Sequence, residues 1–307
     1  MLRYALLRIL GAIPTLLLVI AIAFLMVHAA PGGPFDSERR LPPEIEANIE
    51  RAYHLDESLP QQFVRYLKSA VRGDLGPSFR YREFTVSEVI GGAIPVTMKI
   101  GSLAIVLALV LGIGVGITAG LRRNTFLDRL ITGVAMIGIS VPVFVFAPLM
   151  VLVFAVTWKW LPASYAGSSG ADRLIMPVIA LALPQIAYIA RLTRASLIDV
   201  MNSDFVRTAR AQGLRTTSII RYHALKPTML PLVSYLGPAF AAVLTGSVVV
   251  EHVFGIPGVG RFLVTSATNR DYTLVLGITI FYAAMVIALN LVVDVFYAFL
   301  DPRIRRQ

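Results

Sequence analysis

The sequence predicts an all-α protein that crosses a membrane six times. Hydrophobic residues make up 56% of its 307 residues and charged residues 15%, against roughly 45–50% and 25% in globular proteins. The apolar residues form six runs that can cross a hydrocarbon core, which takes about 20 helical residues. These runs must be helices, because lipid cannot satisfy an open backbone and barrel strands are about half as long.

The predicted spans are residues 9–30, 100–121, 130–157, 174–190, 228–250 and 274–300. The first span follows two basic residues, Arg3 and Arg8, in the same way that the apolar core of a signal peptide follows a basic segment. Its run of about 22 apolar residues exceeds a signal core of roughly 7–15, so we expect a retained anchor helix. Kinks and tilt are expected in the third and fourth spans, which contain prolines. These are Pro142, Pro148, Pro177 and Pro184.

Lysine and arginine predict the orientation of the chain. Fifteen of them lie in four connecting or terminal segments, 1–8, 122–129, 191–227 and 301–307. Only four lie in segments 158–173 and 251–273. The positive-inside rule therefore predicts that both termini are cytoplasmic. Trp158 and Trp160 then fall at an outer aromatic belt.

The long outer loop carries helix signals in two stretches. Residues 41–55, LPPEIEANIERAYHL, begin with prolines followed by acidic residues, which is typical of a helix start. Residues 60–74, PQQFVRYLKSAVRGD, place Phe63, Leu67 and Val71 at helical spacing. We expect two short helices here rather than a linker.

The same loop also contains signals for where helices end and begin. Gly73 would stop the second helix, and Thr85 with Glu88 forms a capping-box pattern that leads back to the membrane. Residues 31–99 are therefore expected to fold as a small helical unit. It would lie between the first span, in residues 1–30, and a five-helix core in residues 100–307.

The connection between the fourth and fifth spans, residues 191–227, is predicted to be helix, sharp turn and helix. Gly213 would end the first helix, Thr216 or Thr217 would cap the next, and Pro227 would begin the fifth span. The apolar residues of the first helix lie roughly on one face. They are Leu197, Val200, Met201, Phe205 and Ala209.

Three functions fit this basic connection. It can be an amphipathic helix whose arginines face anionic lipid, or a docking element for a cytoplasmic partner. A DNA-binding helix-turn-helix is disfavoured, because a turn held between two spans could hardly present a recognition helix to a groove. We therefore expect no nucleic-acid partner.

The connection resembles a loop found in the membrane subunits of ABC importers. That loop has a Glu-Ala-Ala sequence, then a glycine after three residues, then an Ile-x-Leu-Pro-like end. Arg207, Thr208 and Ala209 occupy the Glu-Ala-Ala places, Gly213 the glycine, and HALKP of 223–227 the ending. The arginine in place of glutamate and the lysine before proline are typical of the peptide-transporter branch.

Further matches run along nearly the whole chain. They are LLRIL, APGGPF, AYHLD, GDLGPSF, TGSVVVEHVFGIPGVGRFLVTSATNRDYTLV and VVDVFYAFLDPRIRR. Together they resemble the B-type membrane subunit of an oligopeptide permease. Dipeptide, glutathione and nickel importers on the same scaffold remain alternatives, although ERRLPPEIEANIERAYHLD is most similar to the oligopeptide members.

This resemblance implies a type I importer permease in the bacterial inner membrane. Its partners would be a paralogous C-type membrane subunit, a peptide-binding protein that is periplasmic or lipid-anchored, and two cytoplasmic ABC ATPase subunits that bind ATP and Mg. Its substrate would be a peptide. The chain itself has no Gly-Lys pair and hence no phosphate-binding loop of the Walker type, so we expect no cofactor, metal or catalytic residue in it.

The resemblance also implies that the loop at 191–227 contains a coupling helix that lies in a groove of the ATPase. The candidate coupling residues are Arg207, Ala209, Arg210, Gly213 and Leu214. A glycine permits a tight corner, and arginines can pair with acidic residues of a partner.

On the outer side, EHVFGIPGVGRF after the fifth span resembles a gate or re-entrant element. An ordinary loop with a short interfacial helix is the alternative. The candidate residues are Glu251, Phe254, Pro257 and Gly258. Glu251 would pair with Arg261 or Arg270, or meet the amino terminus of a peptide.

Polar residues at two places in the spans are expected to serve helix packing. Asp294 and Asn290 share a face of the sixth span. Intramembrane acids are candidates for function, but a hydrogen bond between helices is the stronger expectation for Asp294. His28 ends the first span and is expected to pack at the interface.

Two other classes of membrane protein were weighed. Gly167-Ser168-Ser169-Gly170 superficially matches the serine motif of an intramembrane protease, with His223 or His252 as a base. The predicted topology places His223 across the membrane from these serines, although proteolysis needs hydrogen-bond contact. A secondary transporter is disfavoured by the lack of inverted hydropathy halves. The absence of cysteine excludes thiol nucleophiles and disulfides.

Overall fold

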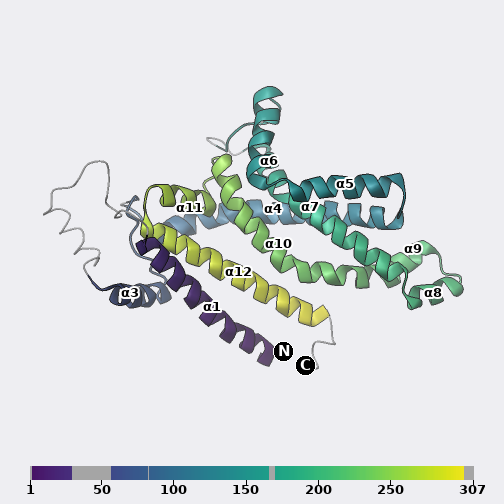
Figure 1. Cartoon of the computed structure of the whole chain (residues 1–307), viewed down its shortest axis with the longest axis horizontal. Helices are drawn as coiled ribbons and strands as arrows, with labels where there is room; N and C mark the ends of the chain where they lie inside the picture. Colours follow the sequence, from purple (N-terminus) through teal and green to yellow (C-terminus); the bar gives the residue numbers. More distant parts are fainter. Residues whose placement is uncertain (1, 30–56, 82, 166–169, 301–307) are drawn as a thin grey trace. The chain divides into compact units, whose positions relative to one another are not determined.

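The computed structural model describes residues 2–29, 57–81, 83–165 and 170–300, most of which are in helices (Figure 1). In these ranges there is no β-strand, only an isolated bridge between Pro77 and Thr85. The predicted all-α class is therefore confirmed. The chain divides into two compact units. One contains Met1–Ala5, Thr97–Ile256 and Ala288–Gln307, and the other contains Leu6–Val96 and Pro257–Ile287.

The larger unit is built around α7 (Asp172–Met201), which packs against α5, α6 and α10 (Figure 1). Besides α7 and the second part of α4 (Val86–Leu121), its helices are α5 (Phe126–Ser140), α6 (Val143–Met150), the π-helix η1 (Val151–Thr157), α8 (Asp204–Ala211), α9 (Thr216–Ser218), the π-helix η2 (Ile219–Ala224) and α10 (Leu225–Val253). The apolar side chains of α7 give it a buried face, which includes Met176, Ile189 and Leu197.

Glycines allow α4 to lie unusually close to α7. Gly112, Gly116 and Gly120 recur every four residues and so line one side of α4. A Cβ atom at Gly116 would lie 2.6 Å from the carbonyl oxygen of Ala190, and one at Gly112 would lie 2.7 Å from Cγ2 of Ile189. Small residues at this spacing let helix backbones approach in a membrane, where dispersion contacts replace the hydrophobic effect.

The third predicted span is broken rather than merely kinked. Helix α5 ends at Ser140, and α6 with η1 continues at an angle of 101° to it. Val141 and Pro142 between them have extended backbone angles, as expected for a proline and the residue before it. Counting this bent pair as one span, the described residues contain six helices or helix pairs that can cross a membrane.

The smaller unit contains most of α1 (Leu2–Ala29), α3 (Leu59–Val71), the start of α4, α11 (Val259–Thr268) and the first half of α12 (Tyr272–Leu300). Its apolar core joins α4, α11 and α12. The buried members are Val86, Ile90, Ala93, Val259, Leu274 and Ile278. Gly277 makes this packing possible, since a Cβ atom there would collide with Val86.

A buried carboxylate, that of Asp271, ties a loop of this unit to the start of α12. It accepts hydrogen bonds from the hydroxyl of Ser78 at 2.5 Å and from the backbone N–H groups of Phe79 and Arg80 at 3.2 Å. It also accepts from the N–H of Leu274 at 3.2 Å. Asp271 thus caps α12 and orders residues 78–80, a role that our sequence analysis did not assign.

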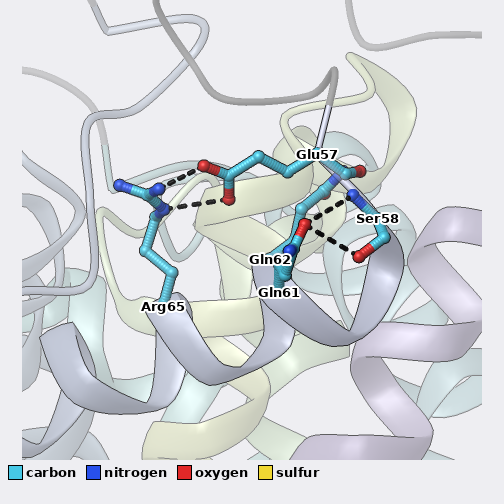
Figure 2. A network of polar contacts seen from close by, with 5 residues as sticks. All are labelled: Glu57, Ser58, Gln61, Gln62 and Arg65. Carbon is cyan, nitrogen blue, oxygen red and sulfur yellow. Dashed lines mark hydrogen bonds and ion pairs between the residues drawn. The ribbon is translucent and has the colours of Figure 1, made fainter.

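The predicted helix at residues 60–74 is confirmed as α3. Ser58 and Gln61 form a capping box at its start, and the guanidinium of Arg65 pairs with the carboxylate of Glu57 (Figure 2). Gly73 ends it with a φ of +81°. Burial raises the pKa of the Tyr66 hydroxyl above its usual range.

Other expectations for the outer loop had mixed outcomes. The capping box of Thr85 and Glu88 is confirmed, with Thr85 N–H donating to the carboxylate at 2.8 Å. Val71 is the last residue of α3, and its side chain is 88% exposed. The expected helix at 41–55 lies outside the described residues.

His28 makes the packing contacts expected of it at the end of α1. Its Nδ1 donates to the carbonyl of Phe24 at 2.8 Å, and its Nε2 lies 3.1 Å from Oε1 of Gln62. The ring also stacks at a tilt on Phe24, with centroids 4.0 Å apart. The imidazole therefore joins α1 to α3 within the smaller unit.

The helices extend beyond several predicted spans. Helix α4 begins at Val86, and α7 continues to Met201 through both of its prolines. The largest difference is in the fifth span, where helix runs without interruption from Thr216 to Val253. Pro227, expected at the start of the fifth span, lies in the first turn of α10. The π-helical turns of η2 change the hydrogen-bond register just before it, which accommodates a residue that cannot donate.

Candidate functional site

Helix α8 is a separate short helix between α7 and the sharp turn. We expected one continuous helix over residues 191–212, but α7 ends at Met201 and α8 begins at Asp204. Ser203 between them has extended angles, φ −71° and ψ 157°, and its hydroxyl donates to the carbonyl of Val200 at 2.6 Å. The sequence Asn-Ser-Asp at 202–204 could have indicated this break, because these residues favour helix starts.

The inner side of α8 packs against η2. Val206 and Ile219 are fully buried and form an apolar cluster with Ala209 and Met201. Ala209, a predicted coupling residue, is 7% exposed. Its methyl group therefore holds α8 in place and does not face outward.

The turn after α8 is a Schellman motif centred on Gly213. The N–H of Gly213 donates to the carbonyl of Arg210 at 2.9 Å, and that of Leu214 donates to Ala209 at 3.2 Å. Gly213 has a φ of +81°, and a Cβ atom there would meet nothing within 4 Å. The backbone angle, and not the available space, is what requires glycine.

Exposed cations and exposed apolar side chains both occur in α8 and the turn after it. Arg207 and Arg210 are exposed, Phe205 is 47% exposed and Leu214 is 40% exposed. We call these four residues the α8 surface. Arg207 pairs with Asp204 at 3.2 Å, but both side chains are solvent-exposed, so this pair contributes little.

The position of Phe205 differs from the prediction. It was expected on one helix face with Ala209, whereas after the break at Ser203 Phe205 is exposed and Ala209 is buried. The change of direction between α7 and α8 resets the helical phase, so a periodicity carried through the break points the wrong way. Arg207, Arg210, Gly213 and Leu214 do come together around one turn.

The end of α10 is a second Schellman motif. Gly255 has a φ of +66°, the N–H of Ile256 donates to the carbonyl of Glu251 at 2.8 Å, and Gly255 N–H donates to His252 at 3.3 Å. Glu251 and Phe254 are buried. The carbonyl of Phe254 accepts from Tyr165 N–H at 2.9 Å, which attaches the loop after η1.

Pro257 and Gly258, the other two gate candidates, belong to the smaller unit. Gly258 is the N-cap of α11, and Pro257 is exposed. The chain turns at Gly255, two residues before Pro257. The short helix α11 follows, as in the simpler alternative of an ordinary loop.

The sixth span gives partial information on its polar residues. Asp294 lies in α12, but its side chain is outside the described part of the chain. Asn290 packs over Gly237 of α10, since a Cβ atom at Gly237 would lie 2.5 Å from Oδ1 of Asn290. This contact fits a role in helix packing.

An aromatic and polar cluster between α7 and α10 was missed by the sequence analysis. Tyr188 and Tyr235 stack with centroids 4.1 Å apart, and the hydroxyl of Tyr235 donates to Oε1 of Gln185 at 2.8 Å. The guanidinium of Arg191 lies 5.4 Å from the ring of Tyr188. Gln185, Tyr188 and Arg191 recur every three residues, a spacing that could have identified them.

Within the described residues, no group of three or more His, Cys, Asp and Glu side chains could hold a metal ion. Ser168 and Ser169 of the protease-like motif lie outside the described residues.

Comparison with known proteins relates the whole chain to transporters. Residues 112–306 match the family described as binding-protein-dependent transport system inner membrane component, and residues 1–101 match the corresponding N-terminal family. The chain is 48% identical over 305 residues to the oligopeptide transport system permease protein OppB of Salmonella typhimurium, which covers 99% of this chain and 100% of the relative.

A second relative and a solved structure extend the comparison. The dipeptide transport system permease protein DppB of Bacillus subtilis is 39% identical, with 99% of this chain and 98% of the relative covered. The structure of the MetNI methionine ABC transporter in inward facing conformations matches 69% of this chain and 96% of that chain, with a TM-score of 0.56 at 17% identity. At that identity, the match concerns the fold.

Proposed function

The chain belongs to the family of binding-protein-dependent transport system inner membrane components, and we propose on this basis that it forms the oligopeptide path of an ATP-driven importer. The observation that carries the proposal is the 48% identity to an oligopeptide permease over the full length of both chains. The chain is a transporter subunit and not an enzyme. The lower identity of 39% to the dipeptide permease favours oligopeptides over dipeptides.

The importer requires other chains. A peptide-binding protein delivers the substrate, and two ABC ATPase subunits bind ATP and Mg and supply the energy. A paralogous C-type membrane subunit completes the path as a heterodimer. The family description supports dependence on a binding protein, and the lack of a Gly-Lys pair supports a separate ATPase.

Both termini and the connection that contains α8 lie on the cytoplasmic side of the inner membrane in this proposal. The excess of lysine and arginine in those segments supports this orientation. Residues 31–99 then face the periplasm and present α3 there. In this orientation, the segment that follows α10 also lies on the periplasmic side.

The α8 surface docks on the ATPase. Arg207 and Arg210 pair with acidic residues of the groove, while Phe205 and Leu214 insert apolar groups, since an arginine fork and a desolvated apolar anchor are common at interfaces. Ala209 acts from behind by fixing α8 on η2. The exposure of the four surface residues and the burial of Ala209 support this division.

The outer gate is formed around the end of α10. Glu251 is a fully buried acid at the end of a long apolar helix, and acids in such places are costly enough to be retained mainly for function. Phe254 is the buried residue before the turn at Gly255, and Pro257 and Gly258, which follow in the chain, remain candidates. Asp294 remains a candidate for the path on the sixth span.

Reconstitution tests the proposal. The chain is expressed with the C-type subunit and the ATPase subunits, purified as a complex and placed in proteoliposomes with the peptide-binding protein. We expect ATPase activity stimulated by binding protein loaded with an oligopeptide, and uptake that requires ATP. Ion-driven uptake by the lone chain, or proteolysis by it, would contradict the proposal. Equal stimulation by a dipeptide-loaded protein would contradict only the substrate class.

A further inference from the structure

Asp128 and Arg194 form an ion pair between α5 and α7, in which the Arg194 side chain is 27% exposed. The carboxylate of Asp128 is in the first turn of α5 and only 3% exposed. Nε of Arg194 donates to Oδ1 at 2.5 Å, and Nη2 donates to Oδ2 at 2.7 Å. The backbone N–H of Asn124 also donates to Oδ2, at 2.9 Å. This two-pronged arrangement holds the start of α5 and the preceding turn on α7.

Stability alone is a weak reason for such a pair. Taking two charges out of water costs about as much as their attraction returns, and apolar residues of similar size often replace a buried pair without loss. The pair can instead fix the orientation of α5 relative to α7. A guanidinium fork on a carboxylate fixes position and angle, whereas apolar contacts such as that of Gly138 with Ala187 permit small sliding movements between helices.

The pair lies on the part of α7 where several helices meet. Gly112, Gly116 and Gly120 of α4 seat against residues of α7 between Ile189 and Leu197. The hydroxyl of Ser196 donates to the carbonyl of Thr228 in α10 at 3.1 Å. Helices α4, α5 and α10 are thus attached to the same two to three turns of α7.

This part of α7 lies directly before α8. Arg194 is two helical turns from Met201, where α7 ends, and α8 begins at Asp204. The connection that contains α8 is continuous with α7 and with α10, whereas α5 is linked to α7 in the chain only through α6, η1 and the loop after them. Movement of α8 therefore reaches α5 through its packing on α7.

We infer that the Asp128–Arg194 pair is a positioning clamp that makes α5, and with it the broken third span, follow α7 when the ATPase moves α8. This inference rests on the proposed function, because it names how coupling spreads from the docking helix. Neither residue touches substrate or nucleotide. They act by keeping two helices in register during the transport cycle.

The surroundings of the pair provide matched controls. A cavity of about 500 Å³ opens beside it and is lined by Asn124, Asp128, Arg129, Thr132, Gly133, Met136 and Arg194. Arg129→Gln removes a charge from the same wall without touching the pair. Thr132→Val removes a hydroxyl whose oxygen is buried and, within the described residues, has no hydrogen-bond partner.

The first experiment measures peptide imported per ATP hydrolysed by the reconstituted complex. We expect Arg194→Gln and Asp128→Asn each to lower this ratio on the order of tenfold, as for loss of one coupling interaction, while basal ATPase activity remains. Arg194→Lys, which retains the charge, should restore part of the ratio. The two controls should leave it unchanged.

Single variants can misfold because they leave a buried charge, so a double variant is needed. Asp128→Leu with Arg194→Met replaces the pair by apolar side chains of similar size, which preserves folding in comparable cases. We expect this variant to assemble normally and yet to be uncoupled. A coupling ratio equal to that of the unmodified complex would overturn the clamp.

A second readout needs no transport. The chain lacks cysteine, so Val134→Cys on α5 and Ala211→Cys on α8, both exposed, can carry spin labels in the full-length chain. We expect a narrow distance distribution between them, and a broadened one in the Leu/Met variant. An unchanged distribution overturns the clamp, whereas a complex that binds no ATPase while the distribution does broaden overturns the proposed function only.

Discussion

At the scale of single residues, backbone angles and buried polar contacts determine how the functional loop is built. Gly213 is needed because φ is +81° and not because space is short. Asp271 is needed because five donors, from Ser78, Phe79, Arg80, Thr273 and Leu274, converge on its carboxylate. Both roles follow from local geometry and can be tested by substitutions that differ in one property.

Substitution of Gly213 should depend on tolerance of left-handed backbone angles. For a residue with a Cβ atom, this left-handed conformation costs roughly 1–2 kcal/mol. The cost is lower for asparagine than for a β-branched residue. We therefore expect Gly213→Asn to retain most ATP-coupled transport and Gly213→Val to lose it. Transport and ATPase rates of the two variants, measured side by side, check this. Equal rates would show that the corner does not depend on the Schellman geometry.

Asp271→Asn should loosen residues 78–80. The amide retains one acceptor oxygen but turns a donor toward the N–H and O–H groups, and each unsatisfied buried group costs about 1–3 kcal/mol. Limited proteolysis of the purified chain should show faster cleavage near Ser78. Asp74→Asn is the control, since Asp74 is exposed and water can replace its bonds to Ser69 and Gly76.

At the scale of helices, close packing and exposed faces separate structural from docking elements. The glycines of α4 serve contact with α7, whereas α8 has a buried side held on η2 and an exposed side with two arginines. A membrane helix needs small residues where backbones meet, while a docking helix needs side chains that reach outward.

The contact of α4 with α7 predicts a steep penalty at Gly116. Its Cβ atom in Gly116→Ala would press on the carbonyl of Ala190 and on Thr193, and overpacking of this kind costs typically 1–3 kcal/mol. Gly114→Ala is the matched control, because nothing lies within 4 Å there and alanine favours helix. We expect a lower thermal midpoint in detergent for the first variant and not for the second.

The arginines of α8 distinguish docking from lipid binding. In Arg207→Glu with Arg210→Glu, like charges would face the acidic groove and weaken association with the ATPase by about tenfold or more. Co-purification at physiological salt measures this. If the variant still binds the ATPase normally but the chain loses sensitivity to anionic lipid, the alternative of an interfacial amphipathic helix is correct.

At the scale of the whole molecule, hydropathy and charge account for the arrangement in a membrane. The six predicted spans correspond to five long helices and one bent pair in the described residues. Their order and the basic connections between them lead to the proposed orientation, with α8 in the cytoplasm and the end of α11 outside.

Cysteine labelling tests this orientation directly in a chain without native cysteine. Asn269→Cys, exposed at the end of α11, should react with a membrane-impermeant maleimide in spheroplasts. Ala211→Cys, exposed at the end of α8, should react only after the membrane is permeabilised. The reverse pattern would show that the chain is inverted relative to the proposal.

Much of the local structure was accessible without coordinates. The helix at α3, its stop at Gly73, the capping box at Thr85 and the turn at Gly213 all arise from residues within a few positions of one another. The error at Phe205 occurred where the helix direction changes between α7 and α8. Periodicity carries no information on such changes.

The sequence by itself determined the class, the spans, the charge asymmetry and the family resemblance, because these depend on composition and on short-range order along the chain. Only the tertiary structure decided which side of α8 is buried. It also decided that Arg194 pairs with Asp128, which lies 66 positions away in the chain. Such contacts depend on how closely helices approach and at which rotation. The packing of many side chains at once sets both, and no short pattern encodes them.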